Sequence, residues 1–181
     1  TASWWLLLLG VAAIAAAWYY TGGNSPYGYR GLGEVSVFVF FGLAAVVGTA
    51  FVQLGSAPWQ VGVASVPVGL LSCSVLVINN LRDIPTDRET GKITLAVRLG
   101  EAGTRRLYAG MIAASYVFAL ALVPFSWWAP LVLLSVPLAV PPVRRVMGGQ
   151  VGHDLVLGLG ETGKLQLAFG VLLSLIHISE P

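Results

Sequence analysis

Long apolar stretches recur along this chain of 181 residues, and they limit what it can fold into. Each is about as long as the roughly 20-residue helix that crosses the hydrocarbon core of a bilayer. None shows the alternation over about ten positions that is typical of a membrane β-strand. The sequence therefore predicts an all-α fold, a polytopic membrane helical bundle of about six transmembrane helices. The predicted helices lie near residues 4–20, 35–54, 61–80, 107–124, 127–143 and 162–174.

Charged residues are scarce, which excludes several classes of protein. Only 10% of the residues are Asp, Glu, Lys or Arg, whereas soluble domains carry about a quarter. The formal net charge of +2 is too small and too scattered for a nucleic-acid-binding surface. A single cysteine, Cys73, excludes a disulfide scaffold. The class that remains is an integral membrane protein, with the lipid bilayer and not nucleic acid as its partner.

The few basic residues are distributed unevenly among the predicted loops. All ten Lys and Arg residues fall on the side of the membrane where the first, third and fifth predicted helices end, whereas residues 53–60 and 125–126 carry no charge. Loops that remain in the cytoplasm are enriched in Lys and Arg. We therefore expect a multi-pass protein of the inner (plasma) membrane whose polar loops are cytoplasmic.

The densest polar segment, residues 79–98, follows the third apolar stretch. Asp83 and Asp87 are four residues apart, and Asn79 precedes Asp83 by four, so a helix would place all three on one face. Carboxylate and amide oxygens suit Mg²⁺, which usually also binds substrate phosphates. Pro85 disfavours a helical conformation in the residue before it, so the aspartates would alternatively straddle a helix end and a loop.

Basic residues in the same segment suit an anionic substrate. Guanidinium and ammonium groups bind phosphate oxygens through charge-assisted hydrogen bonds. The alternative is a solvated loop with local ion pairs between neighbouring residues, Arg82 with Asp83 and Asp87 with Arg88. The candidate phosphate-binding residues are Arg82, Arg88 and Lys92.

A second polar cluster, residues 25–34, lies on the same side of the membrane. Its proline and glycines predict a turn, and its tyrosines would then be anchors at the membrane interface. Alternatively this loop closes over an anionic or aromatic substrate. The residues that would do so are Tyr27, Tyr29 and Arg30.

The polar segments together resemble a known family. The string Asn-Asn-Leu-Arg-Asp-Ile-Pro-Thr-Asp-Arg-Glu-Thr-Gly-Lys at 79–92, followed by Thr-Leu-Ala-Val-Arg-Leu-Gly at 94–100, is similar to the second aspartate-rich motif of the UbiA-type membrane prenyltransferases. The loop at 26–34 and the string Lys-Leu-Gln-Leu-Ala-Phe-Gly at 164–170 resemble the branch that prenylates 1,4-dihydroxy-2-naphthoate in menaquinone biosynthesis.

The resemblance implies a bundle of nine membrane helices around a cavity that opens to lipid. Two aspartate-rich motifs, one in each half, would together hold Mg²⁺ and a polyprenyl diphosphate. The sequence contains no string like the first motif. We therefore expect residues 1–174 to correspond to helices four to nine, as a partial domain that is inactive alone. Residues 175–181 are expected to be a non-native tail.

The resemblance also implies an activity and roles for individual residues. The reaction would transfer a polyprenyl group to 1,4-dihydroxy-2-naphthoate, giving demethylmenaquinone with release of diphosphate and CO₂. Asp83, Asp87 and Arg82 would be catalytic, with Mg²⁺ on the two aspartates. The implied substrate-binding residues are Asn79, Asn80, Arg88, Lys92, Tyr27, Tyr29 and Arg30.

Three alternatives remain open at this point. The first is a prenyltransferase of the same superfamily with another aromatic acceptor, such as 4-hydroxybenzoate or homogentisate. The second is a CDP-alcohol phosphotransferase, whose Asp-Gly-x-x-Ala-Arg block is missing here. The third is a transporter or structural membrane protein, but charges along a path within the membrane would favour that class, and the predicted helix interiors carry none.

Overall fold

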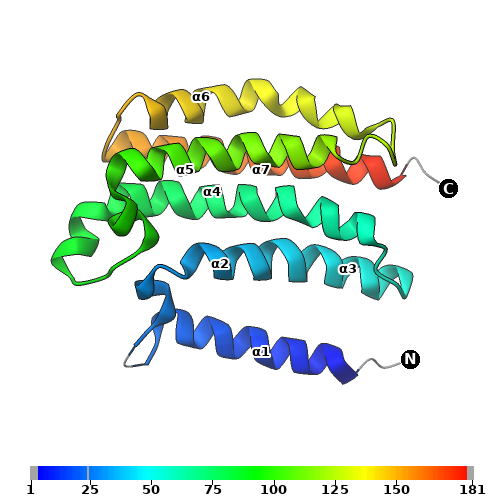
Figure 1. Cartoon of the computed structure of the whole chain (residues 1–181), viewed down its shortest axis with the longest axis horizontal. Coiled ribbons are helices and arrows are strands. Elements are labelled where there is room, and N and C mark those ends of the chain that lie inside the picture. Colours follow the sequence, from blue (N-terminus) through cyan, green and yellow to red (C-terminus); the bar gives the residue numbers. More distant parts are fainter. Residues whose placement is uncertain (1–3, 24, 179–181) are drawn as a thin grey trace.

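The structure is a computed structural model that describes residues 4–23 and 25–178, and its helices run side by side in alternating directions (Figure 1). Within these residues no strand is present, so the predicted all-α class is confirmed. The elements are α1 (Trp4–Thr21), η1 (Tyr27–Arg30), α2 (Gly33–Val37), η2 (Phe38–Ala44), α3 (Ala45–Leu54), α4 (Trp59–Glu89), α5 (Leu95–Leu120), η3 (Ala129–Ser135), α6 (Val136–Met147) and α7 (His153–Ile178).

Among residues 4–23 and 25–178, five segments are long and apolar enough to cross a membrane. The expected helix at 107–124 lies mostly within α5, which runs alongside α4 (Figure 1). The first half of α5 carries Arg98, Arg105 and Arg106, and these charges explain why it is not among the five. The five segments are Trp4–Thr21, Gly33–Leu54, Trp59–Glu89, Ala129–Met147 and His153–Ile176.

Helices α4, α5 and α7 are clearly longer than expected, and α5 begins at Leu95 rather than near residue 107. Helix α4 has 31 residues and continues to Glu89 rather than ending near residue 80. At 1.5 Å per residue it is about 46 Å long, which exceeds the roughly 30 Å hydrocarbon core, so its polar end has room outside the membrane. Helix α7 begins at His153, before the predicted start at 162, and continues past 174. Part of the predicted tail, 179–181, lies outside the described residues.

Helix α4 also passes through Pro85 without ending. Proline removes one backbone N–H from a helix. Local side-chain bonds support the turns that follow it, because the Thr86 hydroxyl donates to the Asp83 carbonyl at 3.0 Å and the Thr90 hydroxyl donates to the Thr86 carbonyl at 3.0 Å. Asp83 and Asp87 are therefore both helical and do not straddle a helix end.

The π-helical segment η2 packs against α4 backbone to backbone. A Cβ added at Gly42 would lie 2.6 Å from the Cα of Gly69, and one added at Gly69 would lie 2.7 Å from the Phe38 ring. Small residues allow such close approach of helices in lipid. This contact holds α2 and the preceding polar loop against the polar half of α4.

The most buried side chains lie among α4, α5, α6 and α7. Tyr108 of α5 is fully buried, and its hydroxyl shares a 2.7 Å hydrogen bond with Thr162 of α7. By contrast, α1 lies at one edge of the bundle and contains no buried residue (Figure 1).

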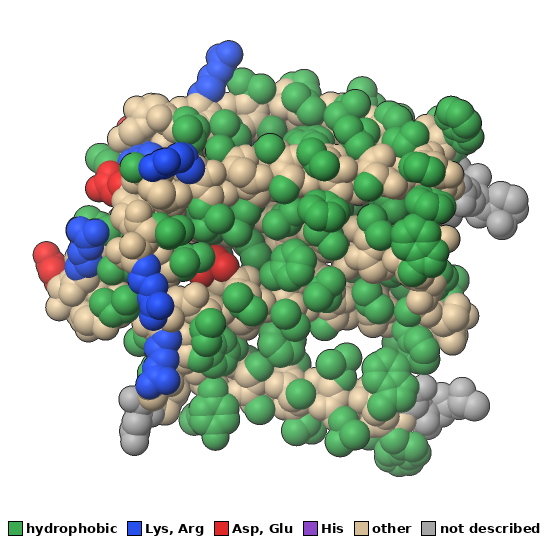
Figure 2. Space-filling model, in the orientation of Figure 1, with side chains coloured by type: hydrophobic (Ala, Val, Ile, Leu, Met, Phe, Trp, Pro, Cys, Tyr) green, Lys and Arg blue, Asp and Glu red, His purple; other side chains and the backbone are tan. Residues whose placement is uncertain are grey.

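In the part of the molecule that the structure describes, charged side chains gather at one end. In Figure 2 the Lys, Arg, Asp and Glu side chains gather at the end where α1 and α4 finish, and hydrophobic side chains cover the rest of the visible face. The exposed tryptophans Trp59, Trp127 and Trp128 occur at the opposite turns of the bundle. This distribution is that of a membrane-spanning bundle with one charged end.

Candidate functional site

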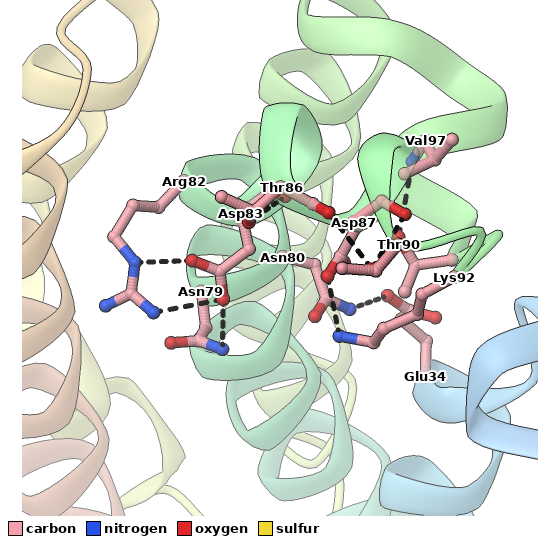
Figure 3. Close-up of polar contacts among 11 residues, drawn as sticks. Glu34, Asn79, Asn80, Arg82, Asp83, Thr86, Asp87, Thr90, Lys92 and Val97 are labelled. Carbon is pink, nitrogen blue, oxygen red and sulfur yellow. Dashed lines mark hydrogen bonds and ion pairs between the residues drawn. The ribbon is translucent and has the colours of Figure 1, made fainter.

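The candidate site at the charged end is built from two regions that are distant in sequence. One is the last turns of α4 with the connection to α5 that follows them, and the other is the loop that contains η1 and leads to Glu34 (Figure 3). Thr94 begins α5, because its side-chain oxygen accepts a 3.3 Å hydrogen bond from the Val97 N–H, as an N-cap residue does.

Asp83 is held by two neighbours on its own helix. Arg82 Nε donates to Asp83 Oδ1 at 2.7 Å, and Arg82 Nη2 donates to Asp83 Oδ2 at 3.0 Å. Asn79 Nδ2 donates to Asp83 Oδ2 at 3.3 Å. All three side chains are half-buried and close together (Figure 3). Both oxygens of this carboxylate therefore have partners.

Asp87 is paired through one oxygen only. Lys92 Nζ donates to Asp87 Oδ1 at 3.0 Å, and the Lys92 N–H donates to the Asp87 carbonyl at 2.9 Å. Asp87 Oδ2 is buried and has no hydrogen-bond partner among the described residues. Buried polar atoms are nearly always paired, so this oxygen is available for a cation or a donor that the chain itself does not supply.

The Lys92 ammonium contacts an aromatic ring as well as Asp87. It lies over the Tyr29 ring, 5.6 Å from the ring centroid. The Tyr29 carbonyl accepts a 3.0 Å hydrogen bond from the Ile93 N–H, and the Arg30 carbonyl accepts a 2.9 Å bond from Arg98 Nη2. These backbone contacts join the η1 loop to the α4–α5 connection, so the two predicted polar clusters form one region.

Glu34 is a member of this region that the sequence did not assign to the site. Its side chain is buried, and Glu34 Oε1 accepts a 3.1 Å hydrogen bond from Asn80 Nδ2 (Figure 3). The Glu34 carbonyl also accepts a bond from Cys73 Sγ at 3.1 Å. An acidic residue directly before an apolar stretch was the available signal. Glu34 anchors the η1 loop to α4.

The predicted site residues thus divide into groups. Asn79, Arg82 and Asp83 form one hydrogen-bonded group, and Asp87 with Lys92 and Tyr29 forms another. The other predicted residues lie apart from these two groups: Asn80 donates to Glu34, Tyr27 bonds to Ala16 and Ser36, and Arg88 and Arg30 are exposed.

Tyr27 is turned toward α1. Its hydroxyl donates to the Ala16 carbonyl at 2.8 Å and shares a 3.0 Å hydrogen bond with Ser36. Its ring packs edge-on against Tyr20. Tyr27 therefore anchors the η1 loop to α1.

The carboxylates at the charged end offer few ligands to a divalent cation. In the described part of the chain no group of three or more His, Cys, Asp or Glu side chains could hold a metal ion. Mg²⁺, however, commonly uses only one or two carboxylates together with substrate phosphates and water. The unpartnered Asp87 Oδ2 fits that requirement.

A cavity of about 350 Å³ adjoins Asn79. It lies between α2–η2, α4 and α7, and most of its lining is apolar. Gln166 and Ser72 also line it, and Gln166 Nε2 donates to Ser72 Oγ at 2.8 Å. Neither residue was predicted to belong to the site, although an amide inside an apolar stretch is a visible signal in the sequence.

Fold and site together define a multi-pass helical membrane protein with paired and partly unpaired charges at one end of the bundle. The chain belongs to the UbiA prenyltransferase family, which residues 1–147 match. This membership favours the prenyltransferase interpretation over the phosphotransferase and the transporter.

Individual relatives agree with the family. The chain is 49% identical over 168 residues to a 1,4-dihydroxy-2-naphthoate octaprenyltransferase of Mycobacterium tuberculosis, covering 92% of this chain and 57% of that protein. It is 48% identical over 145 residues to the Escherichia coli protein of that name, covering 78% and 47%. It is 30% identical over 168 residues to a Drosophila melanogaster UbiA prenyltransferase domain-containing protein 1 homolog, covering 92% and 46%.

The chain therefore spans about half the length of the curated relatives it matches. No solved structure matches it.

Proposed function

We propose that the complete gene product transfers a polyprenyl group from an allylic diphosphate to 1,4-dihydroxy-2-naphthoate in the membrane. Family membership and the names of the relatives at 48% and 49% identity support this acceptor. The observation that carries the proposal is the buried, unpartnered Asp87 Oδ2 beside the Lys92 ammonium. It marks a place where a carboxylate pairs with a cationic side chain through one oxygen and keeps its second, buried oxygen without a partner among the described residues.

The reaction requires charge stabilisation more than proton transfer. The C–O bond of the allylic diphosphate breaks, and its electron pair goes to the diphosphate. In the net change the prenyl group replaces the carboxylate on the ring. The bond between the ring and the carboxylate breaks, its electron pair stays with the ring, and CO₂ leaves. No oxidant is needed, so the immediate product is the quinol form of demethylmenaquinone. Donors directed at the developing negative charge are the usual means of accelerating such a step.

Side chains on α4 and in the α4–α5 connection supply those donors. Lys92 and Arg82 are the cationic groups nearest to the two aspartates, and Asn79 and Asn80 flank them. Arg88 is exposed on the same end and would meet the diphosphate from outside. Tyr29 supports Lys92, and Arg30 with Tyr27 keeps the η1 loop in place over this end.

Asp87 and Asp83 are the residues that would hold Mg²⁺, and the ion would neutralise charge on the departing diphosphate. The fit rests on the free Asp87 oxygen and on the oxygen chemistry of the pair. Asp83 is preoriented by Arg82 and Asn79, so its position does not depend on a bound ligand.

The orientation in the membrane is part of the same proposal. We place the charged end in the cytoplasm, because the Lys and Arg side chains seen in Figure 2 lie there together. A diphosphate would then remain at the aqueous surface of the inner (plasma) membrane while its hydrocarbon tail extends along the apolar bundle. The 181-residue chain alone is proposed to be inactive.

The test is an assay of the complete gene product in membranes with 1,4-dihydroxy-2-naphthoate, a polyprenyl diphosphate and Mg²⁺. We expect a prenylated naphthoquinol that is not formed when a chelator is added. Product formation only with 4-hydroxybenzoate or homogentisate would retain the class of reaction and overturn the acceptor. Absence of product with every acceptor, in membranes where insertion is verified, would overturn the activity.

A further inference from the structure

The cavity beside Asn79 carries an observation that the reaction at the charged end does not use. Gln166 places a carboxamide in its wall, among apolar side chains that include Phe41, Leu76 and Leu159. Polar groups within a membrane bundle are costly and mark functional sites more often than apolar positions do. A ligand in this cavity would therefore lie against the Gln166 carboxamide as well as against apolar side chains.

The interhelical hydrogen bond does not account for Gln166 by itself. Ser72 Oγ already donates to the Val68 carbonyl at 3.0 Å, so Ser72 is satisfied without Gln166. Gln166 uses one N–H toward Ser72. Its carbonyl oxygen and second N–H make no hydrogen bond among the residues that the structure describes, and Gln166 lines both this cavity and a second hollow beside Val68. Interhelical bonds of this kind contribute only about 0.6 kcal/mol in membranes.

A hydrocarbon tail would not make use of this amide. Covering a carboxamide with hydrocarbon leaves its polar atoms unpaired, which is unfavourable. An aromatic ring that carries oxygen atoms would pair with it, and the apolar walls would cover the faces of the ring. The cavity volume of about 350 Å³ is within the range of small-molecule sites. Asn79 connects the cavity to Asp83 at the charged end.

We propose that this cavity is the binding site of the aromatic acceptor, and that the Gln166 carboxamide hydrogen-bonds a ring oxygen of it. The inference rests on the proposed function for the identity of the acceptor as a hydroxylated naphthoate. It adds the location of that ring and a specificity-determining residue on α7. The ring would then lie between η2, α4 and α7, next to the group that positions Asp83.

The test measures binding as well as turnover, using the complete protein in detergent or nanodiscs. Equilibrium dialysis under anaerobic conditions would give the Kd of 1,4-dihydroxy-2-naphthoate for wild type, Gln166→Leu and Thr162→Val. Thr162→Val is the matched control, because it also removes an interhelical hydrogen bond of α7, the 2.7 Å bond to Tyr108, but outside this cavity. We expect about a tenfold weaker Kd for Gln166→Leu, the loss of one hydrogen bond, and no change for Thr162→Val.

A second ligand makes the assignment specific. Removing one ring hydroxyl, as in 1-hydroxy-2-naphthoate, should weaken binding to wild type and weaken it less in Gln166→Leu, since the two changes remove the same contact. In turnover, the KM for the acceptor should rise in Gln166→Leu while the KM for the polyprenyl diphosphate stays unchanged.

The outcomes separate this inference from the proposed function. Equal Kd values for wild type and Gln166→Leu, or a rise in the KM for the polyprenyl diphosphate instead, would overturn the inference. Failure of wild type to bind any hydroxylated naphthoate would overturn it as well. Binding that depends on Gln166 without any prenyl transfer would uphold the cavity assignment and overturn the proposed activity.

Discussion

Two groups of charged side chains lie at the same end of the bundle, and they are satisfied to different degrees. The group where α5, α6 and α7 meet is almost completely paired. Arg105 is only 8% exposed and donates to the carbonyls of Val146 and Gln150. Arg145 donates to both carboxylate oxygens of Glu161, at 3.1 and 2.9 Å. These contacts hold the end of α6 and the loop before α7.

The group on α4 is different. Asp87 keeps one buried oxygen without a partner, and Asn79 lines a cavity. A buried acceptor without a partner costs about 1–3 kcal/mol, so it is not expected where charges serve only to hold helices together. The comparison suggests that full pairing marks the structural group and that incomplete pairing marks the group that binds ligands.

The largest expected effect is on activity, from Asp87→Asn in the complete protein. The side chain keeps its shape but loses the charge that pairs with Lys92. We expect prenyl transfer to fall about 10²–10³-fold, the size of effect seen when a group that stabilises transition-state charge is removed. Initial rates with both substrates saturating would measure it.

Glu89→Gln is the matched control for that variant. Glu89 is exposed, lies two residues from Asp87 and carries the same charge, so its neutralisation should leave the rate unchanged. A rate near that of wild type for Asp87→Asn, with the protein folded in the membrane, would remove Asp87 from the site. An equal loss in both variants would mean that only the net charge of this end matters.

The next effect is on stability, from Arg105→Met. This change removes the guanidinium that donates to the carbonyls of Val146, a buried residue, and of Gln150, and the Val146 carbonyl keeps a longer bond of 3.4 Å from the Gly149 N–H. We expect the free energy of unfolding to fall by about 2–3 kcal/mol, measured by thermal or denaturant unfolding in detergent. Arg106→Met is the control, because Arg106 is exposed and bonds only the carbonyl of Ala102 among the described residues. The KM for polyprenyl diphosphate should not change in either variant.

Much of the fold could be predicted from the sequence, because each membrane pass is a local property of composition. The exceptions follow from interactions that composition does not report. Helix α4 extends to Glu89 because Arg82, Asp83 and Asp87 find partners outside the hydrocarbon region. The early part of α5 is charged and is kinked at Gly100, whose φ of 67° is not helical, and the helix beyond the kink is joined to the end of α6 through Arg105.

The site was predictable in its residue types but not in its grouping. A four-residue spacing placed Asp83 and Asp87 on one helix, as found. The local pair of Arg82 with Asp83 was among the alternatives and is found, but the sequence could not show that Asp87 would pair with Lys92 and not with the adjacent Arg88. Gln166 was visible as an amide in an apolar stretch, but its place beside Asn79 could not be predicted, because it depends on how α7 packs beside α4.

A smaller effect, on the KM for polyprenyl diphosphate, is expected when the ring of Tyr29 beneath Lys92 is replaced. Tyr29→Leu removes the aromatic face 5.6 Å from the ammonium, and an exposed cation–π contact contributes about 0.5–1 kcal/mol. The KM for polyprenyl diphosphate should therefore rise about two- to fivefold. Tyr29→Phe keeps the ring and should behave like wild type. Equal defects in both variants would assign the role to the Tyr29 hydroxyl and contradict the cation–π interpretation.

The smallest effect is expected from Glu161→Gln in the paired group. Arg145 would retain Asp154, whose carboxylate is 3.9 Å away, and the pair with Glu161 is partly exposed, so little stability depends on it. The unfolding midpoint should fall less than in Arg105→Met. The difference from wild type should disappear near 1 M salt, where the screening length is about 3 Å. Prenyl transfer should be unaffected, because Glu161 contacts α6 and not the group on α4. A loss of activity at unchanged stability would place Glu161 in the ligand-binding group, and complete pairing would then no longer distinguish structural charges from functional ones in this bundle.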